Sequence, residues 1–505
     1  MSEASGLPMS RIAPALRTAI PAIAFVASVV FCALELTGKP PGLLSNAPQL
    51  RAKNHSLSLT LHAAIASDGK NSFYFDGQPI APTLRLSPGD QLKITYINDL
   101  PAKPQESCAI PPCHDMTNLH FHGLAISPDA PQDDVLDMMA MPGQSLSYTV
   151  QIPKNHLPGL YWYHTHPHGE SHRQVLDGMS GAIVIEGMER YAPQVGQLRE
   201  RVIVLRGRSM EHDPDAAELR HRVEIPSKGC GGEAEAAEEI FTVNGAVRPR
   251  IEIAPKERQF WRLVNASADR YMDLELEGQI FEIVAMDGEP IAHHDPDHRT
   301  RIADHVLLPP AGRLEGIVTG PAAGTPRRLI SRCVDTGPDG DANPAMILAD
   351  LVPRPSQDAT PKISESSIKP DLKTLDLTAE EETPPRFTVT FTEDKSGFYI
   401  NGEKFTPDAA PMVRAKVGAY QHWKIVNATR ELHPMHIHQV HFLVYAENGR
   451  PIADPLWLDT VNVPYGGSVD VIMDFTDPVI KGMSVFHCHL LNHEDKGMMA
   501  KILFE

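Results

Sequence analysis

The stretch Pro82-Thr-Leu-Arg-Leu-Ser-Pro-Gly-Asp-Gln-Leu-Lys-Ile-Thr-Tyr-Ile-Asn98 recurs in outline twice more along the chain, and this recurrence decides the fold prediction. A proline again stands sixteen positions before an asparagine at Pro249 and Asn265, and once more at Pro411 and Asn427. Apolar and polar residues alternate before each asparagine, which is the pattern of a β-strand with one buried face. We therefore predict three copies of one all-β unit.

The three units are predicted at residues 52–187, 199–352 and 386–505. Between the last two, residues 353–385 are rich in proline, serine, threonine and acidic residues, which is typical of a linker. A chain of 505 residues is too long for one hydrophobic core, so length alone also predicts several domains. The 45 prolines and 35 glycines favour short strands joined by turns over long helices.

The chain carries a formal net charge of −18, which argues against nucleic acid and anionic membrane surfaces as partners. Near its start, Arg11 and Arg17 precede an apolar run from Ala19 to Leu34. The run is long for the core of a signal peptide and short for a membrane span. We predict that residues 1–36 direct export to the periplasm or the cell exterior, either as a cleaved signal or as a retained membrane anchor.

Four cysteines are candidates for disulfides in an oxidising compartment. Cys108 and Cys113 bracket a short loop that one disulfide could close, and the alternative is two free loop thiols. Cys230 and Cys333 could pair across the middle unit, although spacing leaves their connectivity open.

A cysteine stands between two histidines near the C-terminus, in Phe486-His-Cys-His-Leu-Leu-Asn-His493. Thiolate, imidazole and thioether together are the ligands of a blue-copper electron-transfer site, and Cys488, the last histidine of this stretch and Met498 supply one of each. A second histidine must come from elsewhere. Because side chains alternate along a strand, Cys488 should face one way while His487 and His489 face the other. Two metal sites would then be joined through a few bonds.

Histidine pairs with one intervening residue occur four times in the outer units. They are His120 and His122, His164 and His166, His436 and His438, and His487 and His489. Residues i and i+2 share one face of a strand, so each pair presents two imidazoles together. One such pair is weak evidence for a metal site, whereas four are strong evidence. Imidazole clusters bind zinc as well as copper, and the neighbouring cysteine, histidine and methionine favour copper.

From about residue 55 to the C-terminus, these motifs resemble the three-domain multicopper oxidases, which include laccases and bacterial copper oxidases. The resemblance implies an all-β fold of three cupredoxin-like Greek-key β-sandwich domains and four copper ions, one of type 1, one of type 2 and two of type 3. It implies as ligands His433, Cys488, His493 and axial Met498 for type 1, His120 and His436 for type 2, and His122, His164, His166, His438, His487 and His489 for the type 3 pair. No ligand position is missing.

The activity that the resemblance implies is one-electron oxidation of a donor coupled to four-electron reduction of O2 to water. Electrons would pass from Cys488 through His487 and His489 to the type 2 and type 3 ions. The donor is left open between phenols, aromatic amines and metal ions such as cuprous copper. One chain already supplies the whole cluster, so a monomer is expected.

By the same resemblance, Asp133, Asp134 and Glu494 occupy positions of acids that relay protons to the cluster. For the two adjacent aspartates, the alternative is a pair of solvated surface carboxylates. His168 extends the second histidine pair, and we expect it beside the ligands or on the surface. The stretch His293-His-Asp-Pro-Asp-His298 is expected to be an exposed loop.

Three alternatives are weighed against this function. A scaffold protein with the same fold should have lost copper ligands, and none is missing here. An exported copper-binding or storage protein would keep the metal sites but needs no connection between them. Two-domain nitrite reductases also resemble parts of the chain, but the third repeat argues against them.

Overall fold

The computed structural model describes residues 42–102, 114–211, 213–225, 239–322, 327–354, 372 and 375–505. All of them belong to one compact unit spanning Pro41–Glu505. The predicted export segment 1–36 lies outside the described residues, and so do Cys108, Cys113 and Cys230. Cys333, the candidate partner of Cys230, is disulfide-bonded. Among the described residues, no helix is both long enough and apolar enough to cross a membrane.

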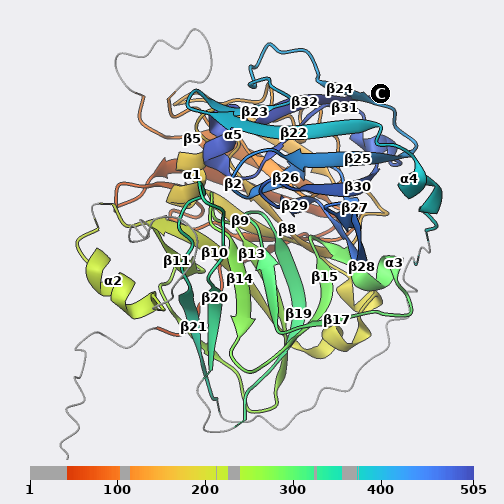
Figure 1. Cartoon of the computed structure of the whole chain (residues 1–505). Helices are drawn as coiled ribbons and strands as arrows, with labels where there is room; N and C mark the ends of the chain where they lie inside the picture. The colour runs from red at the N-terminus through yellow and green to blue at the C-terminus, as the bar shows by residue number, and fades with distance from the viewer. Residues whose placement is uncertain are drawn as a thin grey trace, which may run out of the picture. The chain divides into compact units, whose positions relative to one another are not determined.

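Three β-sandwiches follow one another along the chain, each with two sheets around its own buried core (Figure 1). In the first sandwich, one sheet has the strand order β1 (Gln49–Arg51), β4 (Thr83–Leu86), β9 (Ser180–Ile185), β8 (Gly159–His164) and β6 (His120–His122). The other sheet has the order β3 (Asn71–Tyr74), β2 (Ser56–Ile65), β5 (Gln91–Asn98) and β7 (Ser145–Gln151).

The second sandwich has a larger sheet and a five-stranded sheet. The larger sheet has the order β11 (Glu239–Val243), β10 (Arg199–Ser209), β13 (Arg258–Asn265), β19 (Arg313–Thr319), β15 (Phe281–Met286) and β16 (Glu289–Pro290), with β17 (Arg301–Ala303) also paired to β15. The other has the order β12 (Arg250–Glu252), β21 (Met346–Val352), β20 (Arg327–Arg332), β14 (Met272–Leu276) and β18 (His305–Leu308).

The third sandwich repeats this plan. One sheet has the order β23 (Gly397–Ile400), β22 (Phe387–Asp394), β25 (Tyr420–Asn427), β30 (Ser468–Asp474), β27 (Phe442–Glu447) and β28 (Arg450–Leu458). The other has the order β24 (Val413–Ala415), β32 (Met499–Phe504), β31 (Gly482–Cys488), β26 (His433–Ile437) and β29 (Thr460–Val463). The helices are short: α1 (Ser171–Asp177), α2 (Ala216–Val223), α3 (Ile291–His294), α4 (Thr378–Glu382) and α5 (Leu491–Asp495), with 3-10 turns η1 (Met188–Arg190), η2 (Pro193–Gln197) and η3 (Pro478–Ile480).

The repeated asparagine has the same role in all three sandwiches. As Asn98, Asn265 or Asn427 it ends a central strand, β5, β13 or β25, and its side chain is buried in each case. The side-chain amide donates to two backbone carbonyls at 2.8 to 3.1 Å, namely those of Asp115 and Ala140, of Arg270 and Leu308, and of Glu431 and Val463. Because a buried amide must be satisfied, these bonds fix where each central strand ends. The recurrence in the sequence therefore has a physical cause.

Small apolar clusters join the sandwiches. Trp162 of the first sandwich packs with Val202 and Val264 of the second. Val175 of α1, Ala268 of the second sandwich and Leu491 of α5 form a contact among all three. Figure 1 draws α1 and α5 side by side, so this contact holds α5 in place at the junction.

The strands of the three sandwiches lie within residues 49–185, 199–352 and 387–504. Helix α4 falls inside the predicted linker 353–385, and most of the rest of that segment lies outside the described residues. The domain limits and the linker therefore stay predictions.

Candidate metal centres

Four strands bring the histidine pairs to the junction of the first and third sandwiches. The pairing of β6 with β8 places His120 opposite His164, and the pairing of β26 with β31 places His436 opposite His487. The remaining four histidines lie on or directly after the same strands: His122, His166, His438 and His489. All eight side chains are buried.

Imidazoles of the two sandwiches converge on one another. Nε2 of His487 lies 3.4 Å from Nε2 of His166 and 3.3 Å from Nε2 of His438. The three residues can each offer one nitrogen to a shared centre, because these atoms lie within 4.8 Å of one another. This group contains two residues of the third sandwich and one of the first.

A second set of contacts crosses the same junction. The rings of His120 and His438 stack with centroids 3.7 Å apart, and those of His122 and His436 stack at 3.9 Å. His120, His122 and His164 form another group whose ligand atoms lie within 4.8 Å. The eight imidazoles therefore make one cluster, as the resemblance to multicopper oxidases implied.

Hydrogen bonds hold one nitrogen of several imidazoles and leave the other without a partner. Nδ1 of His164 donates to the carbonyl of Thr165 at 2.9 Å, and Nδ1 of His436 donates to the carbonyl of Asp459 at 2.7 Å. Because a carbonyl only accepts, both rings carry their proton on Nδ1. Their Nε2 atoms, and that of His120, have no hydrogen-bond partner among the described residues. Buried lone pairs on neutral imidazoles are ligand positions for copper, so the cluster fits that metal.

Burial keeps these imidazoles neutral. It lowers the pKa of His164 and His436 to about 3 and that of His487 to about 4, and it lowers the pKa of the other five well below the ordinary value. Neutral imidazole is the form that binds a metal. The cluster is therefore ready for metal at neutral pH.

Cys488 forms a separate group with two histidines of the third sandwich. Its Sγ lies 3.4 Å from Nδ1 of His433 and 3.9 Å from Nδ1 of His493, and these two nitrogens are 3.2 Å apart. The amide of Leu490 donates to the sulfur at 3.5 Å. Met498 is buried, and its carbonyl accepts from the amide of Cys488 at 3.0 Å. His433, Cys488 and His493 form a buried group that could hold a metal ion, and together with a methionine they are the residue types of a blue-copper site. Met498 as the axial ligand stays a prediction.

The two groups are covalently adjacent. His487 belongs to the imidazole cluster and Cys488 to the blue-copper set, as the alternation along a strand predicted. Burial raises the pKa of the Cys488 thiol well above its ordinary value. Because metals bind the thiolate, loading of this site must release a proton.

Comparison with known proteins identifies the family. Three family models, each described as multicopper oxidase, match residues 60–190, 162–298 and 378–505. The chain belongs to the multicopper oxidase family. The oxidoreductase class and the three cupredoxin-type domains predicted from the sequence are thereby confirmed.

Sequence alignments with known multicopper oxidases cover most of this chain. It is 24% identical to the multicopper oxidase mco of Staphylococcus aureus over 86% of this chain and 87% of the relative. It is 26% identical to a laccase of Haloferax volcanii over 85% of this chain and 77% of the relative. A multicopper oxidase structure from Campylobacter jejuni, described as a metallo-oxidase, superimposes with a TM-score of 0.68 at 24% identity, covering 92% of this chain and 96% of the other.

One of the two adjacent aspartates lies against the oxidase's imidazole cluster. The carboxylate of Asp133 is 3.0 Å from Nδ1 of His120 and accepts from Nε2 of Gln439 at 2.7 Å. Burial raises the pKa of Asp133 to about 8. The carboxylate of Asp134 instead accepts from two backbone amides of the following turn. The geometry favours Asp133 over Asp134 as the acid at the cluster, and the relay itself stays a prediction.

Glu494 reaches the cluster from α5. Its Oε1 lies 3.5 Å from Nδ1 of His166, and its Oε2 lies 3.3 Å from Nδ1 of His487. The hydroxyl of Ser171 on α1 donates to Oε1 at 3.0 Å. Burial, aided by the neighbouring Asp495, raises the pKa of Glu494 well above its ordinary value. Glu494 is therefore an acid with a raised pKa beside two cluster imidazoles.

Two charged residues at the cluster belong to no sequence motif. Asp459 lies 3.3 Å from Nε2 of His122, and Arg313 of the second sandwich forms an ion pair with Asp459 at 2.6 Å. Burial would raise the pKa of Asp459, but the charge of Arg313 lowers it below its ordinary value. Single acidic and basic residues in β-rich sequence give no signal that could have identified them.

A small cavity of about 20 Å³ opens onto the blue-copper set. His493 lines it together with three acidic residues, Asp269, Asp341 and Glu431, and with the basic residue Arg270. Oε1 of Glu431 lies 3.5 Å from Nε2 of His493. Burial, together with the nearby carboxyl of Glu393, raises the pKa of Glu431 to about 9. Crowded carboxyls keep a proton until a cation takes its place.

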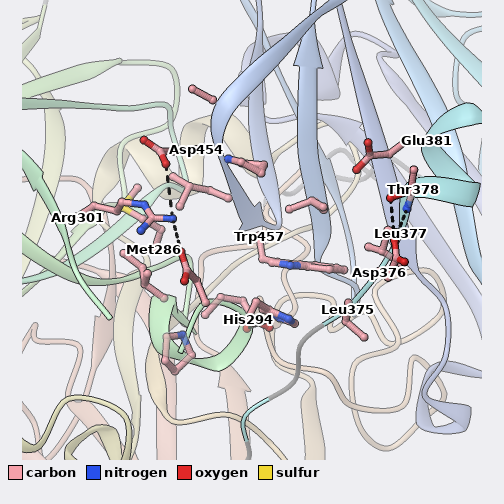
Figure 2. Close-up of a pocket in the computed structure, with 18 residues that line it drawn as sticks. Met286, His294, Arg301, Leu375, Asp376, Leu377, Thr378, Glu381, Asp454 and Trp457 are labelled. Atoms are coloured by element: carbon pink, nitrogen blue, oxygen red, sulfur yellow. Dashed lines mark hydrogen bonds and ion pairs between the residues drawn. The ribbon is translucent and has the colours of Figure 1, made fainter. Parts of the chain in front are cut away.

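A larger cavity of about 370 Å³ lies between the second and third sandwiches (Figure 2). The imidazole of His294 stacks on the indole of Trp457 with centroids 4.5 Å apart. Figure 2 draws these rings together, with Arg301 and Asp454 on one side of the cavity and Glu381 on the other. None of the twelve predicted copper ligands lines this cavity.

Two expectations for other histidines can now be compared with the structure. His293 is 3% exposed and the side chain of His294 is 17% exposed, so the expectation of an exposed loop is wrong for both, because the short helix α3 packs into the protein. The side chain of His298 is 74% exposed, as expected. His168 is buried against Phe405, beside the predicted ligands rather than on the surface.

Proposed function

We propose that this oxidase takes electrons one at a time from a metal ion at the Cys488 site and delivers them to O2 at the imidazole cluster. Copper ions, when bound, would supply the one-electron redox chemistry that joins the two half-reactions. One ion would be held by His433, Cys488, His493 and Met498, one by His120 and His436, and two by His122, His164, His166, His438, His487 and His489. Two findings support this assignment, namely the unpartnered buried nitrogens and the membership of the family.

The observation that carries the choice of donor is the acidic cavity at His493. Its volume of about 20 Å³ holds roughly one water-sized ligand and excludes an aromatic ring. Asp269 and Asp341 supply carboxylate oxygens, and Glu431 adds a further oxygen when a cation replaces its proton. Arg270 also lines the cavity, so the oxygen ligands rather than the net charge favour a metal cation. The size of the cavity and its oxygen ligands therefore favour a small cation over an organic donor.

The chain's own residues divide the remaining work. Burial of both groups keeps bulk water away from the buried sulfur and imidazoles. The peptide link between Cys488 and His487 gives the shortest covalent route from one group to the other. Glu494 and Asp133 are acids with raised pKa values that each lie within reach of a cluster imidazole. Reduction of O2 to water consumes four protons as well as four electrons. These acids are placed to supply them.

The names of the relatives leave the donor open. One sequence relative is a laccase, and the structural neighbour from Campylobacter jejuni is described as a metallo-oxidase. The laccase and the metallo-oxidase are similarly identical to this chain, at 26% and 24%. The choice of donor therefore rests on the cavity.

The test is oxygen uptake by the purified, copper-loaded protein with ferrous ion, cuprous ion and a phenol as separate donors. We expect four metal ions oxidised per O2 and a higher kcat/KM for a metal ion than for the phenol. The double variant Glu431→Gln, Asp341→Asn should raise KM for the metal ion about tenfold, which corresponds to about 1.4 kcal/mol of binding. Its KM for the phenol should stay within about twofold, because these carboxylates contribute nothing to a neutral donor.

Asp454→Asn is the matched control, since it removes an acid that lines the cavity of Figure 2 and whose side chain is 74% exposed. It should leave KM for the metal ion unchanged. A phenol that is oxidised faster than either ion, with no effect of the double variant, would overturn the proposed donor. Absence of oxygen uptake with every donor, despite full copper loading, would instead favour a copper-binding or storage protein.

We also propose that the protein is exported, on the basis of the charged and apolar pattern of residues 1–36. Fractionation of the native host, followed by N-terminal sequencing, would separate a cleaved signal from a retained anchor. Recovery of the uncleaved chain in the cytosol would contradict export.

A further inference from the structure

We propose that Arg313 and Asp459 are positioning residues, through which the second sandwich orients His122 and His436 for metal binding. The second sandwich supplies none of the predicted copper ligands. The inference rests on the proposed function, because it concerns copper at the imidazole cluster. Arg313 begins β19, and Asp459 lies between β28 and β29 of the third sandwich.

The ion pair is buried and makes two contacts. Nη1 of Arg313 donates to Oδ1 of Asp459 at 2.6 Å, and Nη2 lies 2.6 Å from Oδ2. Both side chains have no exposed surface. Nε of Arg313 donates to the carbonyl of Leu160 in the first sandwich at 3.2 Å, and Nη2 donates to that of Asp287 at 2.7 Å. One guanidinium thus joins all three sandwiches with its donors satisfied, as a buried charge requires.

Asp459 contacts two stacked imidazoles and leaves a different nitrogen free on each. Its Oδ1 lies 3.3 Å from Nε2 of His122, whereas its backbone carbonyl accepts from Nδ1 of His436 at 2.7 Å. The unpartnered atoms are accordingly Nδ1 of His122 and Nε2 of His436. In His120 and His164 the unpartnered nitrogen is Nε2, so His122 presents the opposite one. The carboxylate of Asp459 accounts for this difference.

Gly123 provides independent evidence that the Arg313–Asp459 ion pair packs directly against the backbone next to His122. It follows His122 and has φ of 83°, a backbone conformation that favours glycine. A Cβ at this position would overlap Nη2 of Arg313 and would lie 2.6 Å from Oδ2 of Asp459. The ion pair therefore occupies the space directly beside the backbone of His122.

The main test variant is Arg313→Met, Asp459→Leu, which removes both charges together. Replacement of both partners of a buried ion pair by apolar side chains is often tolerated, whereas removal of one partner leaves an unpaired buried charge. The carboxylate of Asp287, which also lies 3.6 Å from Nη1 of Arg313, keeps its hydrogen bonds from the backbone amides of Arg313, Asp459 and Thr460. The backbone carbonyl that holds His436 remains. We expect the blue absorbance per chain to persist while copper affinity at the cluster falls about 10- to 100-fold, the usual effect of losing a residue that orients a metal ligand.

A conservative variant separates positioning from mere packing. Arg313→Met, Asp459→Asn also lacks both charges but returns an oxygen that can accept from Nε2 of His122. It should regain most of the lost copper, measured as copper ions per chain and as the paramagnetic resonance signal of the ion held by His120 and His436. If the pair only fills space, the leucine and asparagine variants should bind equal amounts of copper.

The matched control is Arg262→Met, Glu315→Gln. Arg262 and Glu315 are also a buried ion pair of the second sandwich, and Glu315 lies two residues after Arg313 on β19 and accepts from the amide of Leu160. Neither Arg262 nor Glu315 has a hydrogen bond or ion pair with a cluster imidazole among the described residues. This control should keep its full copper content.

Arg313→Lys provides a version of the test that keeps both charges. Lysine retains a charge for Asp459 but not the two-point contact, so copper affinity at the cluster should fall severalfold with the blue absorbance unchanged. Suppose that the wild-type protein binds four copper ions and consumes O2. If all the Arg313 and Asp459 variants then bind copper as tightly as the wild type, this inference alone is overturned. Wild-type protein that fails in both respects would overturn the proposed function instead.

Discussion

Nε2 of His166 lies 3.4 Å from Nε2 of His487, although the two residues are 321 positions apart and belong to different sandwiches. No sheet pairing joins the first sandwich to the third among the described strands. A metal ion shared by these two imidazoles would therefore act as a cross-link between the sandwiches. Metal binding and docking of the sandwiches should then be thermodynamically coupled.

Removal of copper should lower the melting temperature. A ligand that binds only the folded state stabilises it by about 4 kcal/mol when its concentration is a thousandfold above Kd. We expect chelation to lower the midpoint of calorimetric unfolding, and addition of copper to restore it. An identical midpoint for the metal-free and copper-loaded protein would contradict the coupling.

Cys488→Ser should abolish the blue colour and donor oxidation while the imidazole cluster keeps its copper. Serine cannot replace the thiolate, and His433 and His493 alone do not make a blue site. Visible absorbance, copper content and oxygen uptake would be measured on the same sample. Full activity in this variant would refute the role assigned to Cys488 in joining the two groups.

His164→Ala should spare the blue colour and stop the reduction of O2. Its Nε2 is one of the unpartnered buried nitrogens, and its Nδ1 is held by the carbonyl of Thr165. We expect the donor to reduce the Cys488 site once, seen as loss of the blue absorbance, and we expect no continued uptake of O2. Unchanged oxygen uptake would remove His164 from the cluster.

Glu494→Gln should slow turnover without changing the blue absorbance. The amide keeps the size of the side chain and its contact with Ser171, but it holds no transferable proton beside His166 and His487. A positioned acid typically contributes about 10²- to 10⁴-fold to a proton-transfer step, so oxygen uptake should fall in that range if the step limits turnover. Asp134→Asn is the control, because that carboxylate caps a turn.

His172 should make stability depend on pH. Burial alone would lower its pKa, but the carboxylate of Asp269, 2.7 Å away, outweighs this and raises the pKa to about 9. A pKa raised above the ordinary 6.5 contributes stability that is fully present below about pH 6.5 and is lost as pH rises through 9. His172→Gln should therefore cost on the order of 2 kcal/mol at pH 6 and little at pH 10.

Unfolding midpoints of wild type and variant, taken from pH 6 to pH 10, give the measurement. His62→Gln is the matched control, since the side chains of His62 and Asp99 form an exposed ion pair. A constant difference between wild type and His172→Gln across this range would rule out the titration.

The strand-based part of the site was predictable because it depends on local rules. Alternation along β31 decides that Cys488 and His487 face different groups, and the spacing of each histidine pair decides that its two imidazoles act together. The repeat of Asn98, Asn265 and Asn427 was visible because the same buried amide ends the same strand three times.

The rest depends on tertiary contacts that sequence does not encode locally. Asp133 and Asp134 are neighbours with the same chemistry, and only the turn after them decides which one points to His120. Arg313 and Asp459 lie in different sandwiches, so no spacing relates them. The buried position of His293 likewise follows from a tertiary contact, with the ring of Tyr191.

The buried asparagine that ends a central strand has a consequence for how this architecture tolerates change. The asparagine has the same hydrogen bonds in all three sandwiches. The third sandwich contains the Cys488 group, the first supplies half of the cluster imidazoles, and the second supplies no predicted ligand. The framework of each module is thus independent of its metal chemistry. Metal ligands could therefore be introduced into the middle sandwich, or removed from an outer one, without changing the asparagine hydrogen bonds that fix its strand ends.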